Sequence, residues 1–194
     1  MSQLRFFANA PRHMEPLLAE ELRALGVANV SETRGGVHFE DTLAAAYRVC
    51  LWSRIANRVL LELARFPAET PEALYAGVQA IDWSAHFDVT QTFAVNAITA
   101  RSQIDHSQFA ALKAKDAVVD QFRDRVGERP SVDTLRPQIG ISVYLYRDQA
   151  TVGLDLAGES LHRRGYREEG ASAPLKENLA AAILLRAGWP AIAA

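Results

Sequence analysis

The chain has 194 residues, of which 49% are hydrophobic and 23% charged, so it is long enough to form one large folded domain or two small ones. Its net charge of −2 excludes a protein that attracts nucleic acid through overall positive charge, and any such contact would have to come from local groups of basic residues. The single cysteine, Cys50, excludes an internal disulfide, and no apolar run resembles a signal peptide or approaches the ~20 residues of a membrane span. We therefore expect a cytoplasmic protein without membrane contact.

Residues 4–66 carry the pattern of a strand, a helix, two strands, a second helix and a last strand. A hairpin is indicated around Arg34 and Gly35. The second helix, with Asp41 as its expected N-cap, is predicted to bury the apolar positions at helical spacing, which are Leu43, Ala46, Tyr47, Cys50 and Leu51. This order of elements is that of a ferredoxin-like fold, so the sequence predicts a first domain at residues 1–66.

Two prolines, Pro67 and Pro71, mark the predicted boundary to a second domain at residues 67–157. This domain is expected to contain a short helix at 72–81, a strand at 92–98, a long helix at 106–126 and two strands between 139 and 156. The first of these last two strands alternates strictly, which places Gly140, Ser142, Tyr144 and Tyr146 on its outward side. The predicted fold class is therefore α+β, with a mixed α/β order in the second domain.

The long helix contains two lysines that could bind a phosphate. Lys113 lies on its polar side, whereas Lys115 falls within the predicted apolar stripe of Ala111, Leu112, Val118, Val119, Phe122 and Val126. Either the Lys115 stem packs and its ammonium reaches water, or Lys115 faces a phosphate beside the helix N-terminus. The loop before the helix offers Arg101 for phosphate contacts, and the alternative there is ordinary capping by Ser102 or Asp105.

Residues 158–194 are expected to form a third segment, a basic connector followed by a helix that begins near Pro174 and belongs to neither domain. The connector places Arg163, Arg164 and Arg167 around Tyr166. Arginines can hold phosphates in a forked geometry, and an aromatic ring can stack on an unpaired base. The alternative is a solvated linker whose charge is offset by neighbouring glutamates.

No catalytic or metal site can be assigned from the residues. The five histidines show no metal-ligand spacing, and no glycine-rich phosphate loop of the common types occurs. Cys50, Trp52 and Trp83 are expected to be core residues. The sequence therefore predicts a chain that binds or orients another molecule rather than one that catalyses a reaction.

Many segments in one order resemble the N-terminal region of the RlmL family of bacterial 23S rRNA guanine-N2 methyltransferases. Two examples are Leu51-Trp52-Ser53-Arg54 and Leu161-His162-Arg163-Arg164-Gly165-Tyr166-Arg167. The other matching segments lie at 34–39, 77–83, 92–95, 113–120, 154–156 and 173–182. The resemblance implies a ferredoxin-like part and a THUMP domain, an RNA-binding module, at about residues 45–156.

The resemblance also implies a function. A Rossmann-like catalytic domain that uses S-adenosylmethionine follows this region in the family, and we expect the chain to end before it, to bind no cofactor itself and to be inactive alone. The expected partners are 23S rRNA and the protein's own C-terminal methyltransferase domain. The implied RNA-binding residues are Arg101, Lys113, Lys115, Arg163, Arg164 and Arg167. Two alternatives remain, a related tRNA guanine-N2 methyltransferase and a ferredoxin-like module that senses small molecules or binds proteins.

Overall fold

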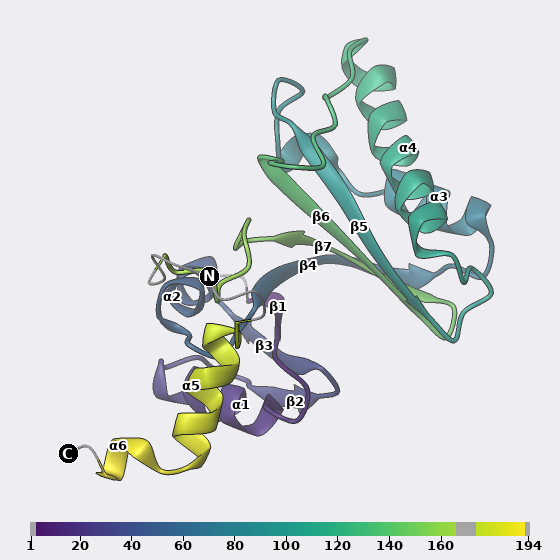
Figure 1. The fold of residues 1–194 in the computed structure, drawn as a ribbon. Coiled ribbons are helices and arrows are strands. Elements are labelled where there is room, and N and C mark those ends of the chain that lie inside the picture. The colour runs from purple at the N-terminus through teal and green to yellow at the C-terminus, as the bar shows by residue number, and fades with distance from the viewer. Residues whose placement is uncertain (1–2, 166–173, 193–194) are drawn as a thin grey trace. The chain divides into compact units, whose positions relative to one another are not determined.

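The computed structural model describes residues 3–165 and 174–192 of the chain. The chain divides into two compact units, of which unit 1 comprises Met1–Leu61 with Glu159–Ala194 and unit 2 comprises Glu62–Gly158. Unit 2 is thus inserted within unit 1 along the sequence, as the colours of Figure 1 show. None of the described helices combines the length and the apolar composition that a membrane crossing requires.

Unit 1 is an antiparallel sheet with two helices between its strands, which confirms the predicted ferredoxin-like fold. Its strands lie in the order β2-β3-β1-β4, and β3 and β4 both pair antiparallel with β1. Phe6 and Phe39 stack in the core with their ring centroids 5.0 Å apart. The elements are β1 (Leu4–Asn9), α1 (Glu15–Ala24), β2 (Ser31–Thr33), β3 (Gly36–Asp41), α2 (Leu43–Trp52) and the first part of β4 (Arg58–Pro67).

Helix α2 is rotated relative to the prediction. It buries Ala45, Ala46 and Val49, whereas Tyr47 and Leu51 are 51% and 65% exposed. Its N-cap is Thr42, whose hydroxyl accepts from the Ala45 N–H at 3.2 Å, rather than the predicted Asp41. Trp52, predicted to be a core residue, is 63% exposed. The helix is apolar on almost every side, so its sequence period does not determine which side packs on the sheet.

Unit 2 contains the remaining strands of the same seven-stranded sheet and two helices, and the later part of β4 belongs to it. Its strands follow the order β4-β7-β6-β5, with β5 and β6 parallel and β6 and β7 antiparallel. Figure 1 shows α3 and α4 together on one face of this sheet. Its further elements are α3 (Pro71–Gln79), a 3-10 turn (Trp83–Ala85), β5 (Phe93–Ala100), α4 (Ser107–Val126), β6 (Ile139–Tyr146) and β7 (Gln149–Asp155).

The core of unit 2 lies between its sheet and its helices. Trp83 is fully buried, as predicted, and its indole N–H donates to the Val78 carbonyl at 2.9 Å. The buried amide of Gln121 accepts from the Trp83 backbone N–H at 2.9 Å and donates to the Ile81 carbonyl at 2.6 Å. A polar side chain in the C-terminal half of α4 therefore fixes the turn that follows α3, because a buried amide left without partners would be unfavourable.

The apolar stripe of α4 also differs from the prediction. The helix buries Ala110, Ala114, Ala117, Val118, Val119, Gln121 and Phe122. Leu112 and Val126, which were assigned to the stripe, are 53% and 56% exposed. Lys115 consequently lies at the border of the packed face rather than within it, and its side chain is 30% exposed.

The C-terminal helix packs within unit 1, although the sequence predicted that it belongs to neither domain. This helix is α5 (Glu177–Arg186), and a short helix, α6 (Trp189–Ile192), follows it. Asn178 is buried and donates from its side chain to the Ile55 carbonyl at 3.1 Å and to Asn57 Oδ1 at 2.7 Å. Ala182, one helical turn later, is fully buried. The sequence could not reveal these contacts because they join residues more than 120 positions apart.

Candidate nucleic-acid interface

Two arginines meet at one end of the unit 2 sheet. The parallel register of β5 and β6 pairs Ala100 with Tyr146, so the next residues, Arg101 and Arg147, leave the sheet at the same end. The Arg147 backbone N–H donates to the Ala100 carbonyl at 3.3 Å. Both arginines are exposed, and Arg101 forms no side-chain hydrogen bond or ion pair within the described part of the chain. This end of the sheet therefore presents two guanidinium groups to solvent.

The backbone at this end is held by Asp148. Its carboxylate accepts from the Gln103 N–H at 2.7 Å, and its own N–H donates to the Ser102 hydroxyl at 3.0 Å. The residues Arg101, Arg147 and Asp148 all have positive φ angles, between 51° and 58°, a conformation that non-glycine residues seldom adopt. The hydrogen bonds of Asp148 offset part of that cost and keep both arginines at the surface.

The two lysines of helix α4 that were predicted to bind phosphate lie on different sides of the helix. The ammonium of Lys113 lies 5.6 Å from the ring centroid of Tyr75 on α3. The Tyr75 hydroxyl donates to Asp120 at 2.8 Å, and this hydrogen bond raises the pKa of Tyr75 to about 12. The ammonium of Lys115 pairs with Asp116. Lys115 also lines a shallow hollow of about 320 Å³ together with Arg129 and Ser131.

The N-terminus of α4 is capped by His106, whose Nδ1 accepts from the Phe109 N–H at 3.1 Å. The sequence had offered Ser102 or Asp105 for this role. Ser102 instead bonds the turn at Asp148, as described above, and the Asp105 backbone carbonyl accepts from the Thr99 hydroxyl at 2.7 Å.

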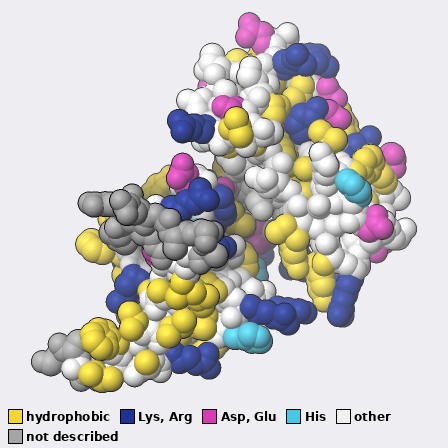
Figure 2. All heavy atoms as spheres, in the orientation of Figure 1, with side chains coloured by type: hydrophobic (Ala, Val, Ile, Leu, Met, Phe, Trp, Pro, Cys, Tyr) yellow, Lys and Arg dark blue, Asp and Glu magenta, His cyan; other side chains and the backbone are white. Residues whose placement is uncertain are grey.

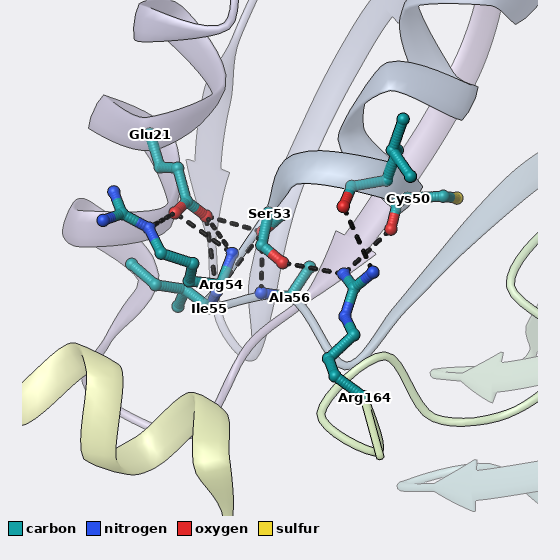
Figure 3. Close-up of polar contacts among 8 residues, drawn as sticks. Glu21, Cys50, Ser53, Arg54, Ile55, Ala56 and Arg164 are labelled. Atoms are coloured by element: carbon teal, nitrogen blue, oxygen red, sulfur yellow. Dashed lines mark hydrogen bonds and ion pairs between the residues drawn. The ribbon is translucent and has the colours of Figure 1, made fainter. Parts of the chain in front are cut away.

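The connector arginines differ in their surroundings. Arg163 is exposed, and its side chain has no hydrogen bond or ion pair with any residue that the structure describes. Arg164 turns inward and donates to the carbonyls of Cys50, Leu51 and Ser53 at 2.9, 3.1 and 3.0 Å (Figure 3). Its guanidinium thereby caps the C-terminal end of α2. Arg167 and the neighbouring Tyr166 lie outside the described residues.

The same end of α2 is held from a second side by Glu21 of α1. Its buried carboxylate accepts from the Ser53 hydroxyl at 2.6 Å and from the backbone N–H groups of Arg54 and Ile55 at 3.1 and 3.3 Å (Figure 3). The Arg54 side chain adds an ion pair at 3.1 Å. A buried carboxylate is stable only with such partners, so this network is structural.

The predicted basic residues are divided between the two units. Arg101, Lys113 and Lys115 belong to unit 2, and Arg163 and Arg164 belong to unit 1. Among the described residues, no group of three or more His, Cys, Asp or Glu side chains could hold a metal ion. Arg147 and Arg129 were not singled out from the sequence, because only the fold brings them beside Arg101 and Lys115.

Comparison with known proteins assigns both units. The model of the RlmL ferredoxin-like domain matches residues 5–60, and the model of the THUMP domain matches residues 68–155. The chain therefore carries the ferredoxin-like and THUMP domains of the RlmL N-terminal region. The THUMP match falls within unit 2 and begins later than the start near residue 45 that the resemblance implied.

Relatives of known name agree with this assignment. The chain is 60% identical over 191 residues to the ribosomal RNA large subunit methyltransferase K/L of Syntrophotalea carbinolica, a match that covers 98% of this chain and 27% of that protein. It is also 60% identical to the methyltransferase K/L of Methylococcus capsulatus, covering 97% of this chain and 26% of the relative. The chain thus spans about a quarter of the length of these relatives.

A solved structure shares the fold of both domains. A putative methyltransferase complexed with SAH has a TM-score of 0.83 and 32% sequence identity, and the match covers 96% of this chain and 49% of the other. The folds of both domains of this chain therefore recur within a longer solved chain.

Proposed function

We propose that this chain is the RNA-binding N-terminal part of an S-adenosylmethionine-dependent 23S rRNA guanine-N2 methyltransferase. The observation that carries the proposal is a THUMP domain whose sheet ends in two exposed arginines, Arg101 and Arg147, in a chain that otherwise has a net charge of −2. Exposed arginines can contact phosphates, which hold RNA in place without reading its sequence. The names of the methyltransferase K/L relatives supply the rRNA substrate.

In the proposed enzyme, this region holds the folded rRNA and a catalytic domain transfers the methyl group. The target guanine has to leave its stack before its exocyclic N2 can reach the methyl donor, so the surrounding RNA must be gripped separately. Arg101, Lys113, Lys115 and Arg163 present their cationic groups at or near the surface and remain our proposed contacts. Arg164 is assigned to the end of α2, and Arg167 lies outside the described residues.

Among the described residues, we find no set that fits S-adenosylmethionine. The sequence has no glycine-rich loop that would bring backbone close to the cofactor. A second hollow, of about 410 Å³, is lined by only one carboxylate, Asp82, and that group is paired with Arg125. We therefore assign no residue here to the cofactor or to the transfer step.

A titration with a structured fragment of large-subunit rRNA at two salt concentrations tests the proposal. Binding should weaken as salt rises, because phosphate contacts release bound counterions. Transfer RNA serves as the competitor, since the related alternative is a tRNA methyltransferase. Absence of RNA binding even at low salt would contradict the proposal, and saturable binding of a metabolite instead would favour the small-molecule module.

A further inference from the structure

The face of the unit 2 sheet opposite α3 and α4 carries two tyrosines. The core side chains Ile141, Val143 and Leu145 of β6 point to the helices, so the alternate residues Tyr144 and Tyr146 point to the other face. Tyr144 is 45% exposed. The two rings are nearly parallel, with 7° between their planes and 6.2 Å between their centroids.

The surroundings of these rings combine one aliphatic side chain with polar ones. The strand register pairs Tyr144 with Ile98 of β5, which is 61% exposed, and with Thr151 of β7. It pairs Tyr146 with Gln149 of β7. Rings bordered by hydroxyl and amide groups are unlike the continuous apolar centre of a stable protein interface, and they suit a ligand with flat faces and polar edges.

The arginines described above complete this surface. The guanidinium carbon of Arg147 lies 5.2 Å from the ring centroid of Tyr146. Arg101 follows the residue paired with Tyr146. In Figure 2 the tip of unit 2, where β5 and β6 end, shows basic side chains beside hydrophobic ones. Positive charge at the end of a strand that carries exposed aromatic rings is complementary to a single-stranded nucleic acid, which offers both phosphates and unpaired bases.

We propose that Tyr144 and Tyr146 stack on unpaired nucleotides of the bound RNA while Arg101 and Arg147 hold the adjoining phosphates. This inference rests on the proposed function and adds to it a recognition site for single-stranded RNA on the open sheet face of the THUMP domain. Sheets elsewhere use aromatic side chains in this way to bind two or three splayed bases. The site would distinguish a loop or a strand end from a duplex, since paired bases expose no face for stacking.

The test compares an unstructured oligoribonucleotide with a duplex of the same length, by fluorescence anisotropy on the whole chain. Tyr144→Ala and Tyr146→Ala should each weaken binding of the single strand by at least about fivefold, because stacking contributes about 1–3 kcal/mol per base. Neither substitution should change duplex binding. Tyr146→Phe should bind like the unaltered chain, and Tyr146→Leu, which keeps apolar bulk but no ring, should behave like the alanine variant.

Tyr47→Ala is the matched control, because Tyr47 is an exposed tyrosine on α2 of unit 1, 51% exposed against 45% for Tyr144. Arg101→Gln and Arg147→Gln should each reduce the slope of log affinity against log salt by about 0.7. Circular dichroism and the melting temperature of each variant establish that it is folded.

Three outcomes would overturn this inference. The alanine variants could bind the single strand as tightly as the unaltered chain does, they could weaken single strand and duplex equally, or they could abolish self-association in sedimentation while leaving RNA binding intact. The last outcome would identify a protein interface. If the unaltered chain bound neither RNA, the proposed function itself would fail, and the two failures are thereby distinguished.

Discussion

Removal of the Arg164 side chain tests whether this residue holds the connector or contacts RNA. The guanidinium donates to three backbone carbonyls, those of Cys50, Leu51 and Ser53. Arg164→Ala removes all three hydrogen bonds and leaves the end of α2 without its cap. The connector residue nearest in sequence, Arg163, makes no such contact within the described chain, so the pair separates the two roles.

The size of the effect follows from the hydrogen bonds. Each ordinary hydrogen bond contributes about 0.5–1.5 kcal/mol net to folding. Water can reach part of this helix end, where Leu51 is 65% exposed, and so the lower half of the range applies. We expect Arg164→Ala to lower the free energy of unfolding by about 2 kcal/mol, which corresponds to a fall in Tm of about 4–8 °C for a chain of this length.

Urea denaturation followed by far-UV circular dichroism measures the change. Arg163→Ala should remain within about 0.5 kcal/mol of the unaltered chain, as exposed substitutions usually do. Arg164→Lys should recover only part of the loss, because one ammonium cannot reproduce the forked geometry of a guanidinium. If Arg164→Ala left stability unchanged and weakened RNA binding as much as Arg163→Ala, the structural role argued for Arg164 would be wrong.

Three further substitutions test other parts of the molecule. Glu21→Gln should lower the free energy of unfolding, measured in urea, by about 1–3 kcal/mol, because the new amide N–H groups would face buried N–H donors. Glu20→Gln, on the exposed side of the same helix, is the control and should change stability little. The hydrogen bond from the Ala28 backbone lowers the pKa of Asp41 below its ordinary 3.8. The ionised carboxylate of Asp41 therefore stabilises the folded chain above pH 3.8, and this contribution is lost as the pH falls through the lower pKa of the folded state. Asp41→Asn should therefore be less stable at neutral pH and lose less stability on acidification, and parallel acid curves for the two proteins would contradict this. Arg101→Glu should weaken rRNA binding at low salt with Tm unchanged, and a large fall in Tm would show that Arg101 is structural.

The sequence predicted the fold well where the pattern of side chains is local. The ferredoxin-like order of unit 1 was confirmed because strands, turns and helices each leave a short-range signal. The outward position of Tyr144 and Tyr146 followed in the same way from strict alternation in β6, although alternation alone does not tell which sheet face stays uncovered.

The errors have a common physical cause. Helix α2 carries apolar residues on several sides, and α4 buries alanines and Gln121 while it exposes Leu112, so hydrophobicity alone did not give the packed face. Arg164 was grouped with Arg163 because composition cannot show that its donors meet carbonyls more than 110 positions earlier in the chain. Side-chain roles that depend on distant partners require the fold to be known first.

Unit 1 is made of two stretches that are separated in the sequence, and this affects how the chain can fold during synthesis. Unit 2 is a continuous stretch, so all of its core residues have been made once β7 is complete. Unit 1 has to wait longer, since Asn178 and Ala182 of its interior are translated only after the whole inserted domain. The complete THUMP domain would thus emerge from the ribosome first. At that point unit 1 is incomplete, and it still exposes the strands and helices that α5 later covers. A shortened gene that stops directly after β7 would for the same reason yield a THUMP domain attached to an incomplete core.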